Sequence, residues 1–554
     1  MNYKIQLLIL FVFSSASHSK VTVIYNANGY TLNQYELTQF ESLAFEDGRV
    51  LQIGSNSKIK ELYADVKLVD AQGLTVLPGL HDSNTNIMQA IQQTKKVDLR
   101  GITSLKEVQE KIQDYIDKNP NNKWIEGFGW DNTLWENKKL PSKKDLDALN
   151  TNQHIWLTNT TGRIGWANSS AIKITRAFKY KRNPKMGKIE FDENQEHRGI
   201  YHDNALNLIQ PHVTRMPIID RYYTLVDILK DLSSLGITTL DDSGIDQKTA
   251  NLYKSLAAKS KLSLRINAII SSADKDLDEF LEKGSFHYEN QLLHIHAIKY
   301  FIDNSIESYG AAVIQPYKDN KKTSKGTIRQ PLDFLDQEIT KRAASGWQAN
   351  LLANGDMASH IAFTVLSNKK STTAELRHRI EEATLISSKD FNQGKLNGQI
   401  ISIQPNFALA KIPLLNKRIN KKSLKNTFAW QSLIKNGARL IAGSHYPQST
   451  ANPFYGIHAL VTQQNRESKH TWKAKEKLTV EQALAAYTIN PAFANHQENS
   501  LGSLERGKWA DFIIIDQDIF KIKAQDIWKT KVLQTWLAGK KIYESDKTNA
   551  SNPK

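Results

Sequence analysis

The sequence predicts an α/β protein: a (β/α)8 TIM-type barrel with a small β-sandwich domain built from both chain ends. Two patterns lead to this prediction. Short strands alternate with helices along the centre of the chain, and both ends consist of strands and turns. A chain of 554 residues, 40% hydrophobic and 23% charged, can bury a large core. A doubly wound parallel sheet is the alternative for the centre.

The first 19 residues are predicted to be a secretory signal peptide. Lys4 supplies a positive start, residues 5–13 are apolar except for Gln6, and Ser17 and Ser19 lie where signal peptidases prefer small residues. The expected location is therefore the bacterial periplasm or the exterior, with a retained anchor as the alternative. No other apolar run is long enough to cross a membrane, so we expect no integral membrane span.

Residues 20–76 and 502–545 are expected to form one composite β-sandwich domain. The first part has short strands around a turn at Asp47 and Gly48. The second part has the apolar run 512–515 and a hairpin that turns at Gly539. Residues 546–554 follow as a polar tail.

Residues 77–501 are expected to form the barrel. Amphipathic periodicity predicts helices at 104–118, 219–235 and 337–345. Each predicted strand precedes a loop and a helix, the order that gives parallel strands with helices outside them. The strands are predicted at 155–158, 238–241, 264–270, 295–302, 347–352, 400–404 and 439–442.

Charge and cysteine content narrow the function classes. The absence of Cys excludes disulfides, thiol nucleophiles and Cys-ligated metal sites. The net charge of +16 indicates either a solubilising surface or an anionic surface or polymer as partner. No helix-turn-helix or zinc-finger spacing is present, so we expect no specific nucleic-acid partner.

A series of motifs in fixed order makes the chain similar to a known family. It resembles the metal-dependent amidohydrolase superfamily, in its amidohydrolase-3 branch. That resemblance implies hydrolysis of non-peptide C–N bonds by water activated on a divalent ion, with the ligands at the carboxyl ends of barrel strands. The motifs that carry it are residues 76–83 (VLPGLHDS), 97–101 (VDLRG), 124–131 (WIEGFGWD), 166–171 (WANSSA), 235–239 (LGITT), 346–348 (GWQ), 379–381 (RIE), 443–444 (GS), 488–492 (TINPA) and 502–511 (GSLERGKWAD).

The positions that the resemblance assigns to metal ligands hold other residues here. The His-x-His pair of the family is replaced by Asn84 and Asn86, the two later His by Leu352 and Glu382, and the final Asp by His445. Asn side chains are weak ligands and Leu is none, so we expect no metal cofactor. A rebuilt site for a divalent ion such as zinc, aided by His81, Asp82 or Asp356, is the alternative.

Two functions from different classes follow. The first is a metal-free pseudoenzyme that binds a small-molecule ligand or has a regulatory role. The second is an active hydrolase on C–N bonds with a rebuilt or metal-independent site. We expect the ammonium of Lys299 to lie near Glu382 or an Asn carbonyl, taking over the charge of the metal. The candidate catalytic residues are Glu382, His445 and Lys299, and the candidate ligand-binding residues are Arg163, Asn84, Asn86 and Trp166.

Overall fold

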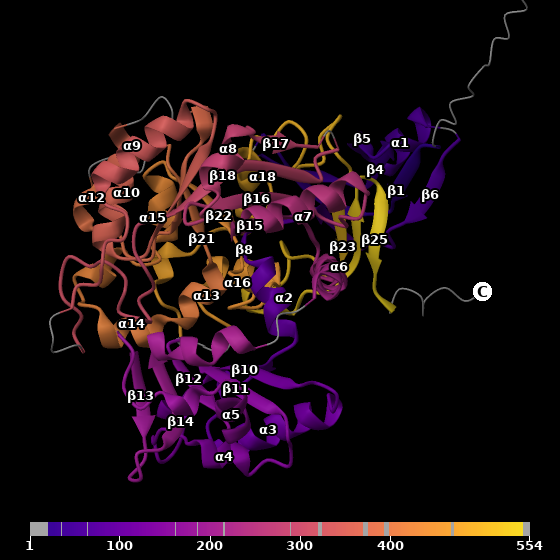
Figure 1. Ribbon diagram of the computed structural model, residues 1–554. Helices are drawn as coiled ribbons and strands as arrows, with labels where there is room; N and C mark the ends of the chain where they lie inside the picture. The colour runs from indigo at the N-terminus through magenta and orange to yellow at the C-terminus, as the bar shows by residue number, and fades with distance from the viewer. Residues whose placement is uncertain are drawn as a thin grey trace, which may run out of the picture.

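The fold was analysed in a computed structural model of the chain (Figure 1). The structure describes residues 20–546 except 35, 64, 161, 186, 214–216, 289, 320–323, 369–374, 393–397 and 467–469. The predicted signal peptide and all but the first residue of the predicted polar tail lie outside the described residues. Within the described part, no helix is both long enough and apolar enough to cross a membrane.

Eight parallel strands form the predicted barrel. Consecutive members of the ring pair in the order β8, β15, β16, β18, β19, β20, β21 and β22. The ring closes where the His445 amide donates to the carbonyl of Asn84 (2.9 Å) and the Asn86 amide donates to that of Tyr446 (2.8 Å). The strands are β8 (Leu80–Thr85), β15 (Ile237–Ile245), β16 (Arg265–Ser271), β18 (Leu293–Phe301), β19 (Gln348–Ala353), β20 (Arg379–Glu382), β21 (Ile400–Ile403) and β22 (Arg439–Ala442).

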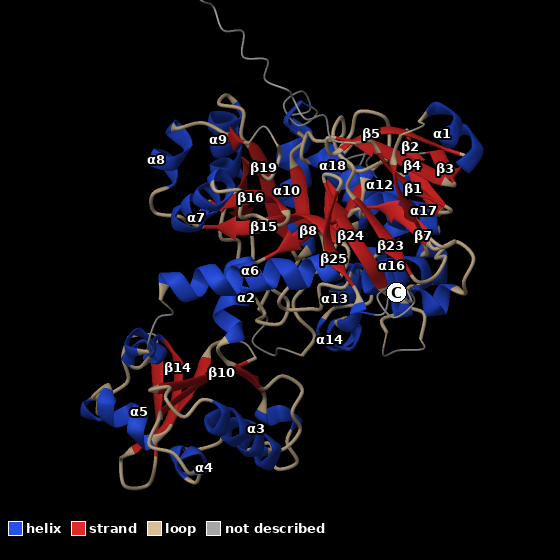
Figure 2. Ribbon diagram, turned by 90° about the vertical axis from the view of Figure 1, so that its right-hand side faces the viewer, coloured by secondary structure: helices blue, strands red, loops and turns tan. Residues whose placement is uncertain are grey.

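Helices cover the outside of this ring because the strands are buried and apolar on their outer face (Figure 2). Helix α7 begins after Asp246, whose carboxylate accepts from the Thr249 amide, a typical N-cap. The covering helices are α2 (Ile87–Thr94), α6 (Ile218–Ser234), α7 (Gln247–Ala258), α8 (Leu277–Glu282), α9 (Leu332–Ala343), α10 (Asp356–Asn368), α12 (Ser388–Asn392), α13 (Pro405–Ala410), α14 (Ile412–Arg418), α15 (Trp430–Lys435), α16 (Pro453–Thr462), α17 (Val480–Ala486) and α18 (Ile489–Ala494).

The two chain ends build the predicted sandwich. One sheet has the order β5-β4-β1-β6 and the other β25-β24-β23-β7-β2-β3, so β7 (Thr75–Pro78) pairs directly with β23 (Phe512–Ile515). Phe45, Phe512 and Trp536 pack between the sheets. The other strands are β1 (Thr22–Tyr25), β2 (Asn28–Asn33), β3 (Glu36–Phe40), β4 (Ser42–Glu46), β5 (Arg49–Gly54), β6 (Lys67–Asp70), β24 (Val532–Leu537) and β25 (Lys540–Glu544), with α1 (Asn56–Leu62) between β5 and β6.

Residues 97–213, called the insert below, form a separate lobe between α2 and α6 (Figures 1 and 2). The strand predicted at 155–158 is β11 of this lobe and does not belong to the barrel. Helices α3 (Leu105–Lys118) and α4 (Lys143–Asp147) pack on one face of the sheet and α5 (Ser169–Ile174) on the other. The sheet contains β9 (Val97–Asp98), β10 (Trp124–Trp130), β11 (His154–Asn159), β12 (Ile164–Ala167), β13 (Gly187–Phe191) and β14 (His197–Asp203).

Candidate functional site

The barrel brings four of the five residues that the family resemblance places at ligand positions to one end of the ring. Asn84 is near the end of β8, Leu352 near the end of β19 and Glu382 at the end of β20, and His445 follows β22. The carboxyl ends of parallel strands meet at the same rim, so these side chains surround the barrel mouth. The fifth position, Asn86, starts α2 instead: its side-chain oxygen accepts from the Gln89 amide at 2.9 Å.

Glu382 and His445 face each other across the mouth. The distance between Glu382 Oε1 and His445 Nδ1 is 3.9 Å. Both residues have positive φ angles, 69° and 64°, an uncommon conformation for non-glycine residues that also occurs in turns and caps elsewhere in this chain. Burial, together with the charges of Lys411 and Lys299, lowers the pKa of His445 to about 3. The imidazole is therefore neutral at physiological pH and is a weak base.

An aromatic side chain that the sequence did not single out supports His445. The Phe407 ring stacks on the imidazole, with 4.4 Å between centroids, and Lys411 Nζ lies 3.8 Å from the centroid of the same ring. Lys411 also pairs with Glu307 Oε1 at 2.8 Å. The charge of Lys411 is therefore already matched by a carboxylate of the chain.

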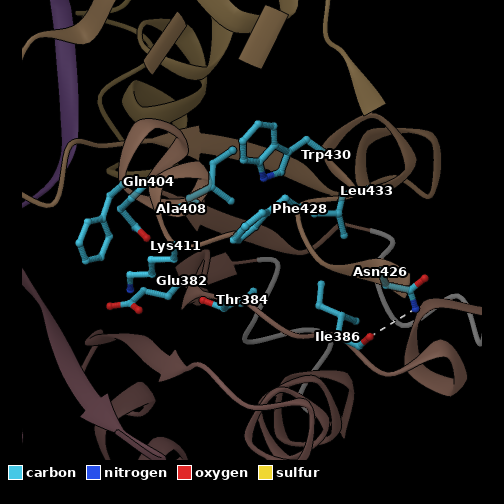
Figure 3. A pocket seen from close by; sticks show the side chains of 13 residues that line it. Glu382, Thr384, Ile386, Gln404, Ala408, Lys411, Asn426, Phe428, Trp430 and Leu433 are labelled. Carbon is cyan, nitrogen blue, oxygen red and sulfur yellow. Dashed lines mark hydrogen bonds between the residues drawn. The ribbon is translucent and has the colours of Figure 1, made fainter. Parts of the chain in front are cut away.

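A narrow pocket opens beside Glu382 (Figure 3). Its cavity volume is about 20 Å³. Glu382 and Lys411 extend to one end of it in the view of Figure 3, where Phe428 and Trp430 form part of its wall. The remaining lining is mainly apolar, from Ile386, Ile403 and Leu433. A space of this size holds about one water molecule, so a larger ligand would need the side chains around it to move.

Lys299 lies near the end of β18, and its approach to Glu382 or an Asn carbonyl stays a prediction. Its residue is 7% exposed, and within the described residues it forms no ion pair or hydrogen bond with Glu382 or an Asn carbonyl. Its Nζ lies 5.8 Å from the Phe301 ring centroid. Burial raises the pKa of Asp242 to about 6, and the charge of Lys299 opposes part of that rise. The same charge adds to the effect of burial and of Lys411 in lowering the pKa of His445. The strand geometry turns the ammonium toward the β15 side of the mouth, where Gly244 leaves space beside its stem.

The carboxylates near the mouth are mostly engaged by backbone amides. Asp303 accepts from the amides of Asn354, Gly355 and Ala312 at 2.8 to 2.9 Å. Burial raises its pKa to about 7 in spite of these bonds. Asp82 Oδ1 accepts from the amides of Ser444 and Asn84, while its Oδ2 has no partner. These groups tie loops to the barrel, as expected for structural carboxylates.

Beneath the mouth a buried ionic network crosses the barrel interior. Arg379 pairs with Asp241 and with Glu381, both at 2.8 Å, and all three side chains are fully enclosed. His81 Nε2 lies 2.7 Å from Asp241 Oδ1. The side-chain Nδ2 of Asn84 donates to Glu381 Oε2 at 3.2 Å. Burial alone would raise the pKa of Asp241, but His81 and Arg379 hold it below its ordinary value. Two candidates, His81 and Asn84, are thus held by the network.

The remaining sequence candidates have structural partners. Trp166 is fully buried in the insert, where its indole donates to the Ser142 carbonyl at 2.8 Å. Arg163 pairs with Asp203 of the insert at 2.7 Å. Asp356 accepts from the Ile314 amide and the Ser423 hydroxyl. The structure therefore brings together Glu382 and His445 and places Trp166 in a core.

The insert contacts the rim through a residue without a predicted role. Arg100 Nη1 donates to the carbonyls of Pro447 and Gln448 at 3.2 and 3.3 Å, two and three residues beyond His445. Asp98 holds the same guanidinium. This contact fixes the insert against the loop that carries His445.

The side chains at the mouth do not fit the metal centre that the family resemblance implies. Across the residues that the structure describes, no group of three or more His, Cys, Asp or Glu side chains is arranged to hold a metal ion. Glu382 and His445 offer two possible metal-binding atoms, 3.9 Å apart. Leu352 has no atom that binds a metal. The side-chain NH2 of Asn84 donates a hydrogen bond to Glu381. A catalytic zinc needs three protein ligands and an open position.

A family model described as "Amidohydrolase family" matches residues 67–543. The chain belongs to this family. The chain is also similar to the structure of an uncharacterized metal-dependent hydrolase from Pyrococcus furiosus, with a TM-score of 0.73 at 25% identity, over 90% of this chain and 100% of that one.

Two relatives extend the similarity along nearly the whole chain. Protein LONG AFTER FAR-RED 3 of Arabidopsis thaliana is 28% identical, over 91% of this chain and 88% of its own length. N-substituted formamide deformylase of Arthrobacter pascens is 23% identical, over 94% of this chain and 98% of its own.

Sequence reasoning missed Phe407, Lys411, Glu307 and Arg100. Phe407 and Lys411 lie three and seven residues beyond Gln404, the last residue of a predicted strand, and Arg100 lies inside a quoted motif. Position after a strand was a usable signal for the first two. Nothing local pointed to Glu307, because its partner Lys411 is far away in the sequence.

Proposed function

We propose that this amidohydrolase-family protein is a metal-free binding barrel whose mouth holds a small organic anion. The observation that carries the proposal is the donor set at the strand ends, in which Asn84, Leu352, Glu382 and His445 replace the ligands of the family and form no three-ligand group. The fold around them is intact, so the mouth retains a shaped cavity without the family's means of activating water.

Lys299 indicates the class of ligand. Lys299 is 7% exposed and forms no hydrogen bond or ion pair within the described residues, so its ammonium is available to a ligand carboxylate. His445 Nδ1 is likewise buried without a hydrogen-bond partner and can bond a polar group of the ligand.

Metal content tests the loss of the metal centre. The protein is purified after growth with zinc, manganese or iron, and its metal content is measured beside that of the Pyrococcus furiosus hydrolase prepared in the same way. We expect only traces in this protein. Near-stoichiometric, tightly held metal would overturn the proposal.

Ligand binding is tested by calorimetry with small carboxylates and their neutral amides. We expect binding of a carboxylate, no binding of its amide, and loss of binding in Lys299→Met. Lys254→Met is the matched control, because Lys254 is a half-buried lysine of α7 that contacts Phe280 and Phe286 on the outside of the barrel. Equal loss in both variants would argue against a specific role of Lys299.

The second candidate is a hydrolase of non-peptide C–N bonds that works without the family metal. The observation that favours it is the approach of Glu382 to His445, with Glu382 as the base and Lys299 and Arg163 as groups that bind or polarise the substrate. The name of the Arthrobacter relative suggests N-formyl compounds as the first substrates to test. Turnover that resists chelators and is abolished by Glu382→Gln would replace the first proposal with this one.

We also propose that the protein is exported to the periplasm or the exterior, on the basis of residues 1–19. N-terminal sequencing of the protein from cell fractions tests this. A mature chain that begins at Lys20 is expected, and a cytoplasmic chain that retains residues 1–19 would contradict it.

A further inference from the structure

A strongly basic segment with exposed apolar side chains lies on the outer layer of the insert. From Lys173 to Lys188 the sequence contains seven Lys or Arg residues and no Asp or Glu. Within the same stretch Ile174, Phe178 and Tyr180 are 57%, 45% and 51% exposed. Large apolar side chains are seldom so exposed side by side in a soluble protein.

Packing of the insert explains why these side chains face outward. Helix α5 and the following 3-10 turn (Ala177–Lys179) cover one face of the insert sheet, opposite α3 (Figure 2). Ile172 and Ala177 point into that layer and are buried. Residues that alternate with them, Ile174 and Phe178, therefore lie on the other side of the layer.

Six of the seven cations of the segment form no ion pair with the described residues. Lys188 pairs with Glu190 at 2.7 Å. No ion pair of the described residues involves the other six, Lys173, Arg176, Lys179, Lys181, Arg182 and Lys185, all of which are exposed. The insert is set apart from the barrel (Figures 1 and 2), so this surface can approach a flat partner without a clash with the barrel.

We propose that this surface, residues 173–188, docks the protein on an anionic lipid bilayer. Cations attract anionic headgroups, and exposed Phe, Tyr and Ile side chains enter the boundary between headgroups and acyl chains. A soluble anionic polymer would match the charge but would leave the three apolar side chains in water. The combination therefore favours a bilayer. This inference is independent of what the barrel mouth binds.

Vesicle co-sedimentation of the full chain tests the proposal. We expect binding to vesicles of phosphatidylcholine mixed with phosphatidylglycerol and none to phosphatidylcholine alone. The charge variant Lys179→Glu, Lys181→Glu and Arg182→Glu should weaken binding by more than about tenfold. The apolar variant Ile174→Ser, Phe178→Ser and Tyr180→Ser should also lose binding while keeping its thermal midpoint, because these side chains are exposed.

A matched charge control comes from another basic stretch of the chain. Lys417→Glu, Lys421→Glu and Lys422→Glu changes the net charge equally at exposed residues of the barrel and should leave binding nearly unchanged. If the charge variant of residues 173–188 and the control variant lost vesicle binding equally, net charge alone would explain the binding. That result would overturn the proposal. Failure of the wild-type protein to bind anionic vesicles would do the same.

Insertion of the apolar side chains can be observed directly, because the chain has no cysteine. Phe178→Cys and the control Phe334→Cys, at a residue of α9 with 43% exposure, are labelled with an environment-sensitive fluorophore. We expect a blue shift on anionic vesicles at position 178 and none at 334. A response to a soluble anionic polymer instead of vesicles, or no response at 178, would overturn a bilayer as the partner.

Discussion

Two buried cations inside the same barrel have opposite surroundings. Arg379, at the start of β20, sits between Asp241 and Glu381 at 2.8 Å from each. Lys299, near the end of β18, is almost as deeply buried and has no ion pair within the described residues. The first belongs to the closed interior beneath the mouth and the second to the mouth itself.

The difference separates the structural part of the barrel from the part available to a ligand. In the interior network each charge meets an opposite charge or an amide, so removing one member leaves the others uncompensated. At the mouth, the buried Nδ1 of His445 and Oδ2 of Asp82 have no hydrogen-bond partner among the described residues, and Lys299 forms no ion pair there. A ligand can bind these groups without disturbing the fold.

The largest expected effect comes from breaking the interior network. Arg379→Met should lower the free energy of unfolding by about 3–5 kcal/mol, because it leaves the Asp241 and Glu381 carboxylates buried without their cation. The thermal midpoint measures the loss. Arg163→Met, which removes an exposed ion pair with Asp203, is the control and should cost no more than about 1 kcal/mol. Equal midpoints for the two variants would contradict a structural network.

Replacement of Asp82 is expected to change the free energy of unfolding by a smaller, pH-dependent amount. Burial raises its pKa to about 6, above the ordinary value, so the folded state loses stability as pH rises from about 4 to about 6. Asp82→Asn keeps the acceptor for the amides of Ser444 and Asn84 and removes the charge. It should match the wild type near pH 4 and exceed it by on the order of 1–3 kcal/mol above about pH 7.

Thermal midpoints of both proteins across this range check the prediction. Asp192→Asn serves as a control of opposite sign, because hydrogen bonds from the amides of Glu196 and Asn194 lower the pKa of that exposed carboxyl. Asp192→Asn should not raise the thermal midpoint at high pH. An Asp82→Asn gain that is the same at every pH would argue against titration as its cause.

The smallest expected effect on stability is at Lys299. Because its ammonium has no ion pair to lose, Lys299→Met should change the free energy of unfolding by less than about 1 kcal/mol, in either direction. Chemical denaturation beside Arg379→Met makes the comparison, since both variants replace a buried cation with Met. A loss as large as that of Arg379→Met would place Lys299 in the structural network and remove the basis for an anionic ligand.

Most of the fold was accessible from local sequence. Predicted strands at 264–270, 400–404 and 439–442 differ from β16, β21 and β22 by one residue at most at either end, because their apolar runs are bounded by polar turns. The predicted helix at 104–118 corresponds to α3 with its Ser104 N-cap. The run 155–158 shows the limit of this reasoning: a strand's residues do not say which sheet it joins.

The residues by themselves determined which side chains stand where the resemblance places ligands and which strand ends carry them, since motif spacing sets both. Only the tertiary structure decided what those side chains contact. Ring closure pairs Asn84 with Glu381 and directs Asn86 to cap α2, and the core of the insert encloses Trp166. Lys299 and Glu382 are 83 positions apart in the chain, and whether they meet depends on the stagger of the intervening strands. Such contacts join residues far apart in sequence, where local propensity carries no information.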